Sequence, residues 1–351
     1  RRGGVHVVAG RAGPLGAAVR HLGVPVVELG PERGRGVVGT VAAGLAVARA
    51  PGLGRTVADV AARSAVRSLP TPDVVLFHGA GSVLLRGAAP AGVPTVVHVH
   101  ELATGLARSG PPAALRRLLA GASRVVAVAP ASAAAAVDAG ARAGRVDIVP
   151  GVVDPDAPGR RRAAARAVVG VANEVPVAGG AGRPGWRKGT GRLPTLAREL
   201  GRVVGGGTTT VWVGGRPAGV EADRAGVDDG VRWYDEREDP WAVLDAADVV
   251  VVPSREDPLP LVALEAGQRG LPVVATATGG LPGLLADGRG AVVGTHDLPG
   301  LASAVGRLLS DPDAASAAGE ALRAHVALHH AVGAGVPAWG QALVDAAGGG
   351  S

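Results

Sequence analysis

The stretch DVVVVPSREDPLPLVALEAGQRGLPVVATATGG, residues 248–280, decides the predicted fold of this chain. The four valines after Asp248 are apolar on both faces, which is typical of a strand buried in a parallel sheet. Pro258 and Pro260 suit the first turn of a helix over 259–267, because a missing N–H costs little there. The helix would begin at the carboxyl end of a strand, where open α/β sheets bind ligands, so its free N–H groups predict an anion site.

Strands and helices alternate along the rest of the chain, the pattern of parallel α/β domains. The length of 351 residues is comfortable for two such domains. We assign residues 1–155 to an N-terminal domain, 156–172 to an interdomain linker and 173–328 to a C-terminal domain. Residues 329–351 then form a C-terminal helix and a disordered tail. The predicted fold class is therefore α/β, with two doubly wound Rossmann-like domains facing a cleft.

Composition narrows the function classes. The formal charge of +6 and the pI near 11.0 allow an anionic partner, but the arginines are dispersed and aromatic residues make up only 2%. Nucleic acid is therefore not an expected partner. The chain has no cysteine, which excludes disulfides and thiolate metal sites, and neither a signal peptide nor a membrane-spanning run is visible. We expect a cytoplasmic protein, with peripheral contact to acidic lipid at the inner face of the membrane left open.

The loop GGAGRPGWRKG, residues 179–189, lies between a predicted strand and a predicted helix. It holds Lys188, the single lysine of the chain, together with Arg183 and Arg187. Glycines let the backbone approach a ligand closely, and cations beside them are typical of a phosphate cradle. The spacing matches neither a P-loop nor a G-x-G-x-x-G fingerprint. The residues alone therefore leave a flexible loop with solvated cations as the alternative.

Two acids and two histidines are further candidates. Asp257 could be no more than a helix N-cap, and Glu265 could be no more than the surface partner of Arg269, four residues later. From the second turn of the helix, the Glu265 carboxylate could instead accept two hydrogen bonds from a ribose diol. His98 and His100 share one face of a strand, but the sequence offers no third metal ligand with suitable spacing. A histidine at the carboxyl end of this strand could hydrogen-bond a substrate. The alternative is a histidine that only packs in the core or at the edge of the sheet.

Several segments of the chain match one family pattern. They are PSREDPLPLVALEA at 253–266, GLPVVAT at 270–276 followed by Gly279-Gly280, GWRKG at 185–189, VVHVHEL at 96–102 and VPGVVD at 149–154. Together they resemble the signature segments of family 4 glycosyltransferases, which are retaining, metal-independent enzymes that use nucleotide sugars and have the two-Rossmann GT-B fold. The resemblance covers most of the chain, and residues 253–280 are its most specific part.

The resemblance implies a retaining glycosyltransferase of hexosyltransferase type. Such an enzyme moves a sugar from a nucleotide-diphosphate sugar to an acceptor hydroxyl on a glycan, a lipid or a small molecule, without a metal or other cofactor. His100 and Asp257 would be the catalytic residues beside the transferred sugar. Lys188 would bind the diphosphate, Glu265 the ribose, and the segment around Trp233 the base. The implied donor-binding residues are Arg183, Arg187, Lys188, Gly189, Trp233, Leu259, Pro260, Leu261 and Glu265.

The chain also departs from the family pattern. Gly151 stands where the pattern has asparagine, and Val5–Leu29 corresponds to the second strand onward. We therefore expect the first strand and an acceptor-side glycine loop to be missing from the N-terminal domain. A non-catalytic or inactive nucleotide-sugar-binding protein on the same scaffold is the alternative. A related epimerase or a nicotinamide dehydrogenase is a weaker alternative, because a glycine fingerprint with an acid about 20 residues later is not found.

Overall fold

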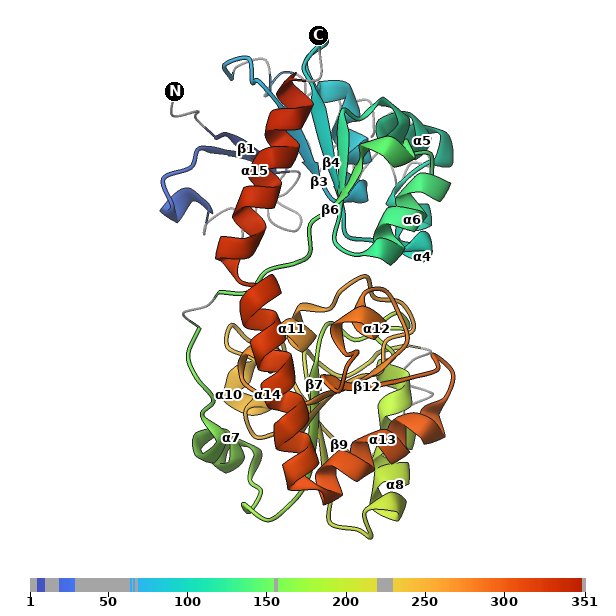
Figure 1. Ribbon diagram of the computed structural model, residues 1–351, viewed down its shortest axis with the longest axis vertical. Helices are drawn as coiled ribbons and strands as arrows, with labels where there is room; N and C mark the ends of the chain where they lie inside the picture. Colours follow the sequence, from blue (N-terminus) through green and yellow to red (C-terminus); the bar gives the residue numbers. More distant parts are fainter. Residues whose placement is uncertain are drawn as a thin grey trace.

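The computed structural model describes residues 5–9, 19–28, 64, 66, 69–154, 157–219 and 230–348. Within these ranges the chain forms two α/β domains, which are drawn one above the other in Figure 1. The predicted pair of parallel-sheet domains is confirmed. A helix that the sequence predicts near 38–49 lies outside the described residues.

The N-terminal domain is built from parallel strands. Strands β1 (Val7–Ala9) and β2 (Val26–Glu28) pair with each other, and a four-stranded sheet follows in the order β3-β4-β5-β6. Its strands are β3 (Val75–His78), β4 (Thr95–Val99), β5 (Arg124–Ala127) and β6 (Val146–Ile148). The connections are η1 (Ala80–Ala88), α4 (Ala103–Ser109), α5 (Pro112–Gly121), α6 (Pro130–Asp138) and η2 (Ala143–Arg145). Because the strands run the same way, the ends of β3 and β4 bring their histidines to one edge of the sheet.

The C-terminal sheet has six parallel strands in the order β12-β11-β10-β7-β8-β9. They are β7 (Val177–Ala181), β8 (Thr209–Val213), β9 (Val231–Tyr234), β10 (Val249–Val252), β11 (Val273–Thr276) and β12 (Gly290–Val293). The strand order reverses between the paired strands β7 and β10. Open α/β sheets bind ligands at the carboxyl ends of the strands at such a point, so the loops after β7 and β10 mark the place for a site.

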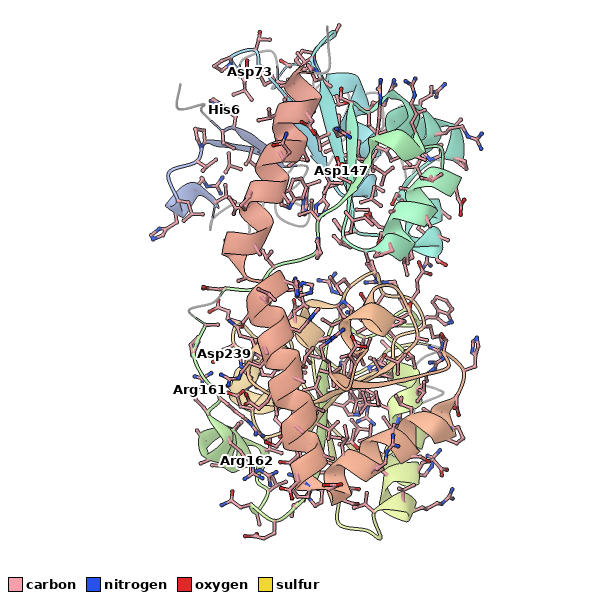
Figure 2. The ribbon with its side chains drawn as sticks, viewed as in Figure 1. His6, Asp73, Asp147, Arg161, Arg162 and Asp239 are labelled. Carbon is pink, nitrogen blue, oxygen red and sulfur yellow. The ribbon has the colours of Figure 1, made fainter. Side chains whose placement is uncertain are left out.

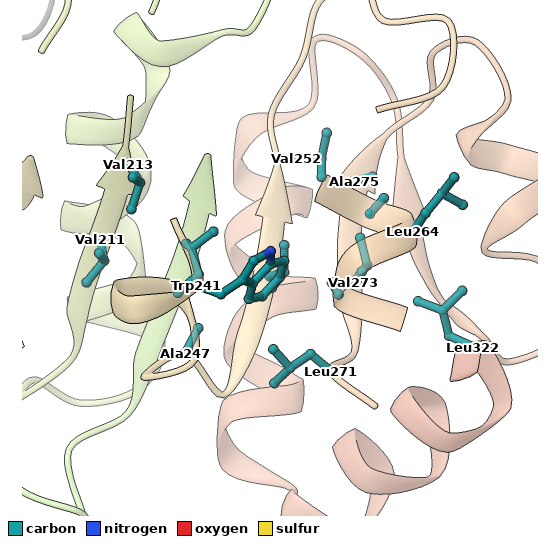
Figure 3. Close-up of a cluster of buried hydrophobic side chains, with 14 of the residues drawn as sticks. Val211, Val213, Trp241, Ala247, Val252, Leu264, Leu271, Val273, Ala275 and Leu322 are labelled. Atoms are coloured by element: carbon teal, nitrogen blue, oxygen red, sulfur yellow. The ribbon is translucent and has the colours of Figure 1, made fainter. Parts of the chain in front are cut away.

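Helices cover both faces of this sheet. They are η3 (Thr190–Arg192), α8 (Leu193–Val203), α10 (Trp241–Leu244), α11 (Leu261–Gln268), α12 (Leu281–Leu284), α13 (Leu298–Ser310) and α14 (Pro312–His329). One face packs against Trp241, Leu264 and Leu322 of the helices (Figure 3), and on the opposite face Trp212 of β8 packs in a cluster with Leu301 of α13. All four valines of β10 are buried, as the sequence predicts. The core is built largely from Val, Leu and Ala because the chain has few aromatic residues.

Part of the predicted linker is a helix. Helix α7 (Arg162–Val169) lies within residues 156–172 and packs beside α10. Its Arg166 is 1% exposed and donates to Asp248 Oδ2 over 2.7 Å. The same guanidinium donates to three backbone carbonyl oxygens just beyond the helix. Buried charge therefore ties this segment to the C-terminal domain.

The last helix returns to the N-terminal domain. Helix α15 (Val332–Gly348) follows α14 after a short turn and packs against β4 and β5 (Figure 1). Two of its buried residues, Ala342 and Ala346, share a hydrophobic cluster with Val96, Val126 and Val149 of the N-terminal domain. A parallel bridge between Val153 and Ala331 joins the two segments in which the chain crosses between the domains. No helix in the described ranges combines the length and the apolarity needed to cross a bilayer.

Candidate functional site

Two loops meet at the carboxyl ends of β7 and β10. Residues 182–189 follow β7, and residues 253–260 follow β10. The backbone carbonyl of Arg187 accepts hydrogen bonds from the N–H groups of Arg255 and Glu256, over 2.8 and 3.2 Å. The two loops are therefore held together at the point where the strand order reverses.

Lys188 and Asp257 form an ion pair between these loops. The Lys188 Nζ atom lies 2.7 Å from Asp257 Oδ2, and the two side chains are 20% and 4% exposed. Arg187 Nη1 lies 4.0 Å from the other oxygen of the same carboxylate. The Ser254 hydroxyl donates to Asp257 Oδ2 over 3.4 Å, and the backbone N–H of Asp257 donates to the Thr278 hydroxyl over 3.1 Å. The predicted phosphate loop and the predicted sugar-facing acid are thus in direct contact.

The ion pair indicates what this place can do chemically. A buried carboxylate is costly unless it is paired, so Asp257 holds Lys188 in the crevice. The ammonium sits on a flexible stem and can turn to another anion without a change in the backbone. Arg187 adds a second cation beside the same carboxylate. The site is therefore suited to an anionic ligand that replaces Asp257 as the partner of Lys188.

The loops approach so closely that two positions require glycine. Gly189 has a φ of +72°, and a Cβ there would lie 2.0 Å from the carbonyl oxygen of Pro253. Gly279 has a φ of +55°, and a Cβ there would lie 2.0 Å from the carbonyl oxygen of Asp257. L side chains rarely adopt this backbone region, and a Cβ cannot share the space with a carbonyl oxygen. These glycines let the loops after β7, β10 and β11 close around Asp257.

Helix α11 begins two residues later than the sequence predicts. Pro260 is its N-cap, with an extended backbone and a ψ of 123°. A proline disfavours helical geometry in the residue before it, and Pro258 and Pro260 both precede the helix. The predicted phosphate-contacting residues therefore form the approach to α11. Leu259 is half-buried, Pro260 is buried and Leu261 is 53% exposed at the first helical position.

Glu265 lies in the second turn of α11, on the wall of a pocket of about 400 Å³. Its Oε2 atom accepts a hydrogen bond from Trp241 Nε1 over 3.0 Å. Arg269 meets Glu265 through the backbone carbonyl, over 3.4 Å, and its guanidinium lies over the Trp241 ring. Arg161 and Asp239, which form an ion pair, line the same pocket (Figure 2). The pocket offers carboxylates and an aromatic ring to a polar ligand.

One predicted donor residue lies apart from this centre. Trp233 on β9 packs against the hydrophobic cluster under α8, whereas Glu265 belongs to α11 on the opposite face of the sheet. The neighbouring Tyr234 packs on the α11 face, as the alternation of side chains along a strand requires. Arg183 is exposed in the loop after β7. The structure therefore does not bring Trp233 into the ion-paired centre.

The N-terminal domain brings three histidines together at one edge of its sheet. His78 on β3 lies opposite His98 on β4, and His100 follows two residues later. Their ring centroids are 4.9, 5.1 and 5.3 Å apart, and the Nδ1 atoms of His78 and His98 are 3.1 Å apart. The sequence reasoning missed His78, which only the pairing of β3 with β4 reveals. No group of His, Asp or Glu side chains in the described ranges has metal-binding geometry, and the expected metal independence stays a prediction.

His100 is held in place by its neighbours. Its side chain is 43% exposed, and its backbone N–H donates to Glu101 Oε2 over 3.0 Å. The other oxygen of Glu101 accepts a hydrogen bond from the N–H of Ala80, also over 3.0 Å. A Cβ at Gly79 would lie 2.8 Å from His100 Nε2, so this glycine lets the imidazole approach the backbone. The backbone of His100 is thus held by Glu101, and its imidazole is open enough to contact a ligand.

His98 makes the stability of the protein depend on pH. Burial, with smaller contributions from His78 and His100, lowers the pKa of His98 to about 3. In the unfolded chain an imidazole titrates near pH 6.5, so below that pH the unfolded state binds a proton that the folded state does not. Stability is therefore lost as the pH falls, by roughly 1 kcal/mol between pH 7.5 and 5.5 from His98 alone.

Urea unfolding at the two pH values measures this loss. His98→Asn should remove the contribution of His98 from the difference in unfolding free energy. His6 is exposed (Figure 2), and His6→Asn is the control, which should keep the pH dependence of the wild type. An equal pH dependence in His98→Asn and the wild type would contradict the prediction.

The two halves of the site meet at the boundary between the domains. The Glu256 carboxylate, next to Asp257, accepts hydrogen bonds from the backbone of α4, the helix that follows His100. Gly151, at the crossing out of the N-terminal domain, faces α11, since a Cβ there would lie 3.5 Å from Leu261. The histidine edge and the Lys188–Asp257 pair therefore border the same interdomain boundary.

Solved structures share this architecture. HepE from Anabaena, in complex with UDP-glucose, superposes with a TM-score of 0.78 at 20% sequence identity, covering 97% of this chain and 91% of that chain. Sucrose-phosphate synthase from Thermosynechococcus elongatus superposes with a TM-score of 0.68 at 24% identity, covering 79% of this chain and 74% of that chain. At these identities the likeness defines the fold, which is the two-domain GT-B fold.

Family models match both domains. Residues 3–157 match the model described as Glycosyltransferase Family 4, and residues 180–311 match the model described as Glycosyl transferases group 1. The chain belongs to the family 4 glycosyltransferases. The resemblance drawn from its motifs is thereby confirmed.

Curated relatives carry one recurring name. The D-inositol 3-phosphate glycosyltransferase of Mycolicibacterium smegmatis is 36% identical over 217 residues, which are 57% of this chain and 48% of the relative. The protein of the same name from Nocardia farcinica is 34% identical over 261 residues, which are 67% of this chain and 58% of the relative. The chain thus matches about half the length of these relatives.

Proposed function

We propose that this protein transfers a sugar from a nucleotide-diphosphate sugar to an acceptor hydroxyl. The proposal is carried by the 2.7 Å contact between Lys188 and Asp257, where the loops after β7 and β10 meet ahead of α11. A helix N-terminus beside a partly buried ammonium favours a diphosphate. Membership of a glycosyltransferase family supports the same class of reaction.

In the proposed complex, Lys188 leaves Asp257 and binds the donor diphosphate. Arg187 and Arg183 add positive charge from the same loop, and the N–H groups of Leu261 and Val262 at the start of α11 complete the anion site. Asp257, freed from the ammonium, then faces the transferred sugar. Glu265 accepts hydrogen bonds from the ribose hydroxyls in the pocket beside α11.

The transfer itself is proposed to retain the configuration of the anomeric carbon. The acceptor hydroxyl attacks from the face on which the diphosphate departs, so the old C–O bond breaks and the new one forms on one side of the sugar. The hydroxyl proton passes to the departing phosphate oxygen. Lys188 and the arginines stabilise the charge that develops on that oxygen, so no metal ion is needed. His100 lies on the acceptor side and hydrogen-bonds the sugar.

The relatives guide the choice of substrates. Those from Mycolicibacterium and Nocardia are named for D-inositol 3-phosphate, and HepE was solved with UDP-glucose. We take UDP-glucose as the first donor and D-inositol 3-phosphate as the first acceptor to test. The wider proposal is a cytoplasmic enzyme of glycan, glycolipid or glycoconjugate synthesis.

Glu265→Ala is expected to weaken UDP-glucose binding roughly tenfold, because charge-assisted hydrogen bonds from ribose hydroxyls are lost. Isothermal titration calorimetry measures the affinity. Glu320→Ala, which removes an exposed acid on α14, is the control and should bind as the wild type does. No binding of UDP-glucose or of other nucleotide sugars by the wild type would overturn the proposed function. Binding without transfer to any acceptor would favour a non-catalytic nucleotide-sugar-binding protein.

Peripheral contact with acidic lipid is a further part of the proposal. Arg116 and Arg117 on α5 and Arg142 and Arg145 at the two ends of η2 are exposed on one region of the N-terminal domain, with Asp138 as an exposed acid nearby. Each arginine near an anionic surface contributes about 1 kcal/mol. Such a surface suits lipid head groups, and the scarcity of aromatic side chains disfavours single-stranded nucleic acid.

Charge reversal tests this contact. Arg116→Glu with Arg117→Glu should lower binding to phosphatidylserine vesicles at least about tenfold in a sedimentation assay. Arg198→Glu with Arg202→Glu, on α8 of the other domain, is the matched control. Equal sedimentation with neutral phosphatidylcholine vesicles would rule out the electrostatic contact.

A further inference from the structure

Glu256 connects the donor loop to the N-terminal domain. Its Oε1 atom accepts hydrogen bonds from the backbone N–H groups of Thr104 and Gly105, over 3.1 and 3.2 Å. These N–H groups belong to the first turn of α4, where no partner exists within the helix. Glu256 is only 9% exposed. If the domains shifted, its carboxylate and the two N–H groups of α4 would lose these hydrogen bonds, which is costly for buried groups.

The first turn of α4 is in turn packed on the residue that holds His100. A Cβ at Gly105 would lie 2.9 Å from the Cβ of Glu101, so helix and side chain are in van der Waals contact. Glu101 accepts the backbone N–H of His100 over 3.0 Å. A continuous path of contacts therefore leads from Glu256 across the domain boundary to the segment that carries His100.

The other end of the path is fixed on the C-terminal domain. The backbone N–H of Glu256 donates to the carbonyl of Arg187, over 3.2 Å, in the loop that carries Lys188. The next residue, Asp257, is the ion-pair partner of Lys188. Asp257 thus makes its contact within the C-terminal domain, whereas the adjacent Glu256 contacts the N-terminal domain.

We infer that Glu256 is a positioning residue that sets how the N-terminal domain sits on the donor loop. By holding α4, it fixes the distance between His100 and a sugar bound beside Asp257. The effect on transfer rests on the proposed function, whereas the effect on domain position does not. A misplacement of about 1 Å between reacting groups can lower a rate about 100-fold, so loss of the Glu256 contact is expected to lower the transfer rate.

The absence of cysteine allows a direct measurement of domain position. Ala134 on α6 and Ser303 on α13 are exposed and lie in different domains, so Ala134→Cys with Ser303→Cys accepts a pair of spin labels. In this background Glu256→Ala should broaden the interdomain distance distribution and shift it to longer values. Glu256→Gln keeps one carbonyl acceptor and should give an intermediate distribution. Glu320→Ala should match the wild type, and circular dichroism checks that each variant is folded.

The same variants are then compared for UDP-glucose binding and for release of UDP at saturating UDP-glucose. The inference expects binding within about twofold of the wild type and a rate lowered about tenfold in Glu256→Ala, with partial recovery in Glu256→Gln. An unchanged distance distribution in Glu256→Ala would overturn the inference. A shifted distribution with an unchanged rate would overturn its positioning role. Failure of the wild type to bind any nucleotide sugar would instead overturn the proposed function, while the spin-label result would still decide the role of Glu256 in domain position.

Discussion

Lys188→Ala should weaken the binding of UDP-glucose by roughly 100-fold, because it removes charge-assisted hydrogen bonds to the diphosphate from a partly buried site. It should also lower the free energy of unfolding by about 1–3 kcal/mol, since the buried carboxylate of Asp257 loses its closest partner. Calorimetric titration measures the first effect, and urea unfolding measures the second.

A double variant separates binding from stability. Lys188→Ala combined with Asp257→Asn removes the unpaired charge, so most of the lost stability should return while the affinity for UDP-glucose stays low. Arg202→Ala, a cation on α8 that is 73% exposed, controls for the change in net charge. Affinity of Lys188→Ala within a few-fold of the wild type would remove Lys188 from the proposed phosphate site.

Gly189→Ala is expected to damage both the fold and the site. The new Cβ would lie 2.0 Å from the carbonyl oxygen of Pro253, in a backbone conformation with a φ of +72°. The loops after β7 and β10 would have to separate, so we expect a loss of about 3 kcal/mol or more in the free energy of unfolding. Binding of UDP-glucose should be lost as well, because Lys188 immediately precedes this glycine.

Gly207→Ala provides the matched control. Gly207 has a φ of +76°, and a Cβ there would meet nothing within 4 Å. Alanine at this position adds the same backbone strain without the clash, so it should cost only about 1 kcal/mol and leave binding intact. If both variants lose equal stability in urea, the close approach of the loops is not what Gly189 serves.

The sheet around β10 could be predicted well because its strands are buried on both faces. The run Val249–Val252 has no polar position, so it can belong only to the middle of a covered sheet. Short helices were harder to predict. Helix α4 contains Thr, Gly and Ser in seven residues, and α7 begins in a cluster of arginines that reads as solvent-exposed linker. The burial of Arg166 depends on Asp248, which is far away in the sequence.

The candidate site was predictable in its residues and not in its contacts. Glycine and lysine in one loop, and acids near a helix start in another, suggested a phosphate site. The direct pairing of Lys188 with Asp257 depends on the order of strands in the sheet, which alternation alone does not give. The roles of Thr278 and Glu256 depend on third segments that meet the loop in space. Trp233 lies on the face of the sheet away from α11, and the family pattern that pointed to the segment around it does not give the direction of its side chain.

Helix α15 has a consequence for how the chain is made. The N-terminal domain buries Val96 and Val126 only when Ala342 and Ala346 arrive, and the ribosome makes these residues after the whole core of the C-terminal domain. The C-terminal domain draws its core from residues 153–326 and has all of them earlier. We therefore expect the second domain to be complete before the first, and the growing chain to keep an apolar face of its first sheet uncovered until the last turns of α15 leave the exit tunnel.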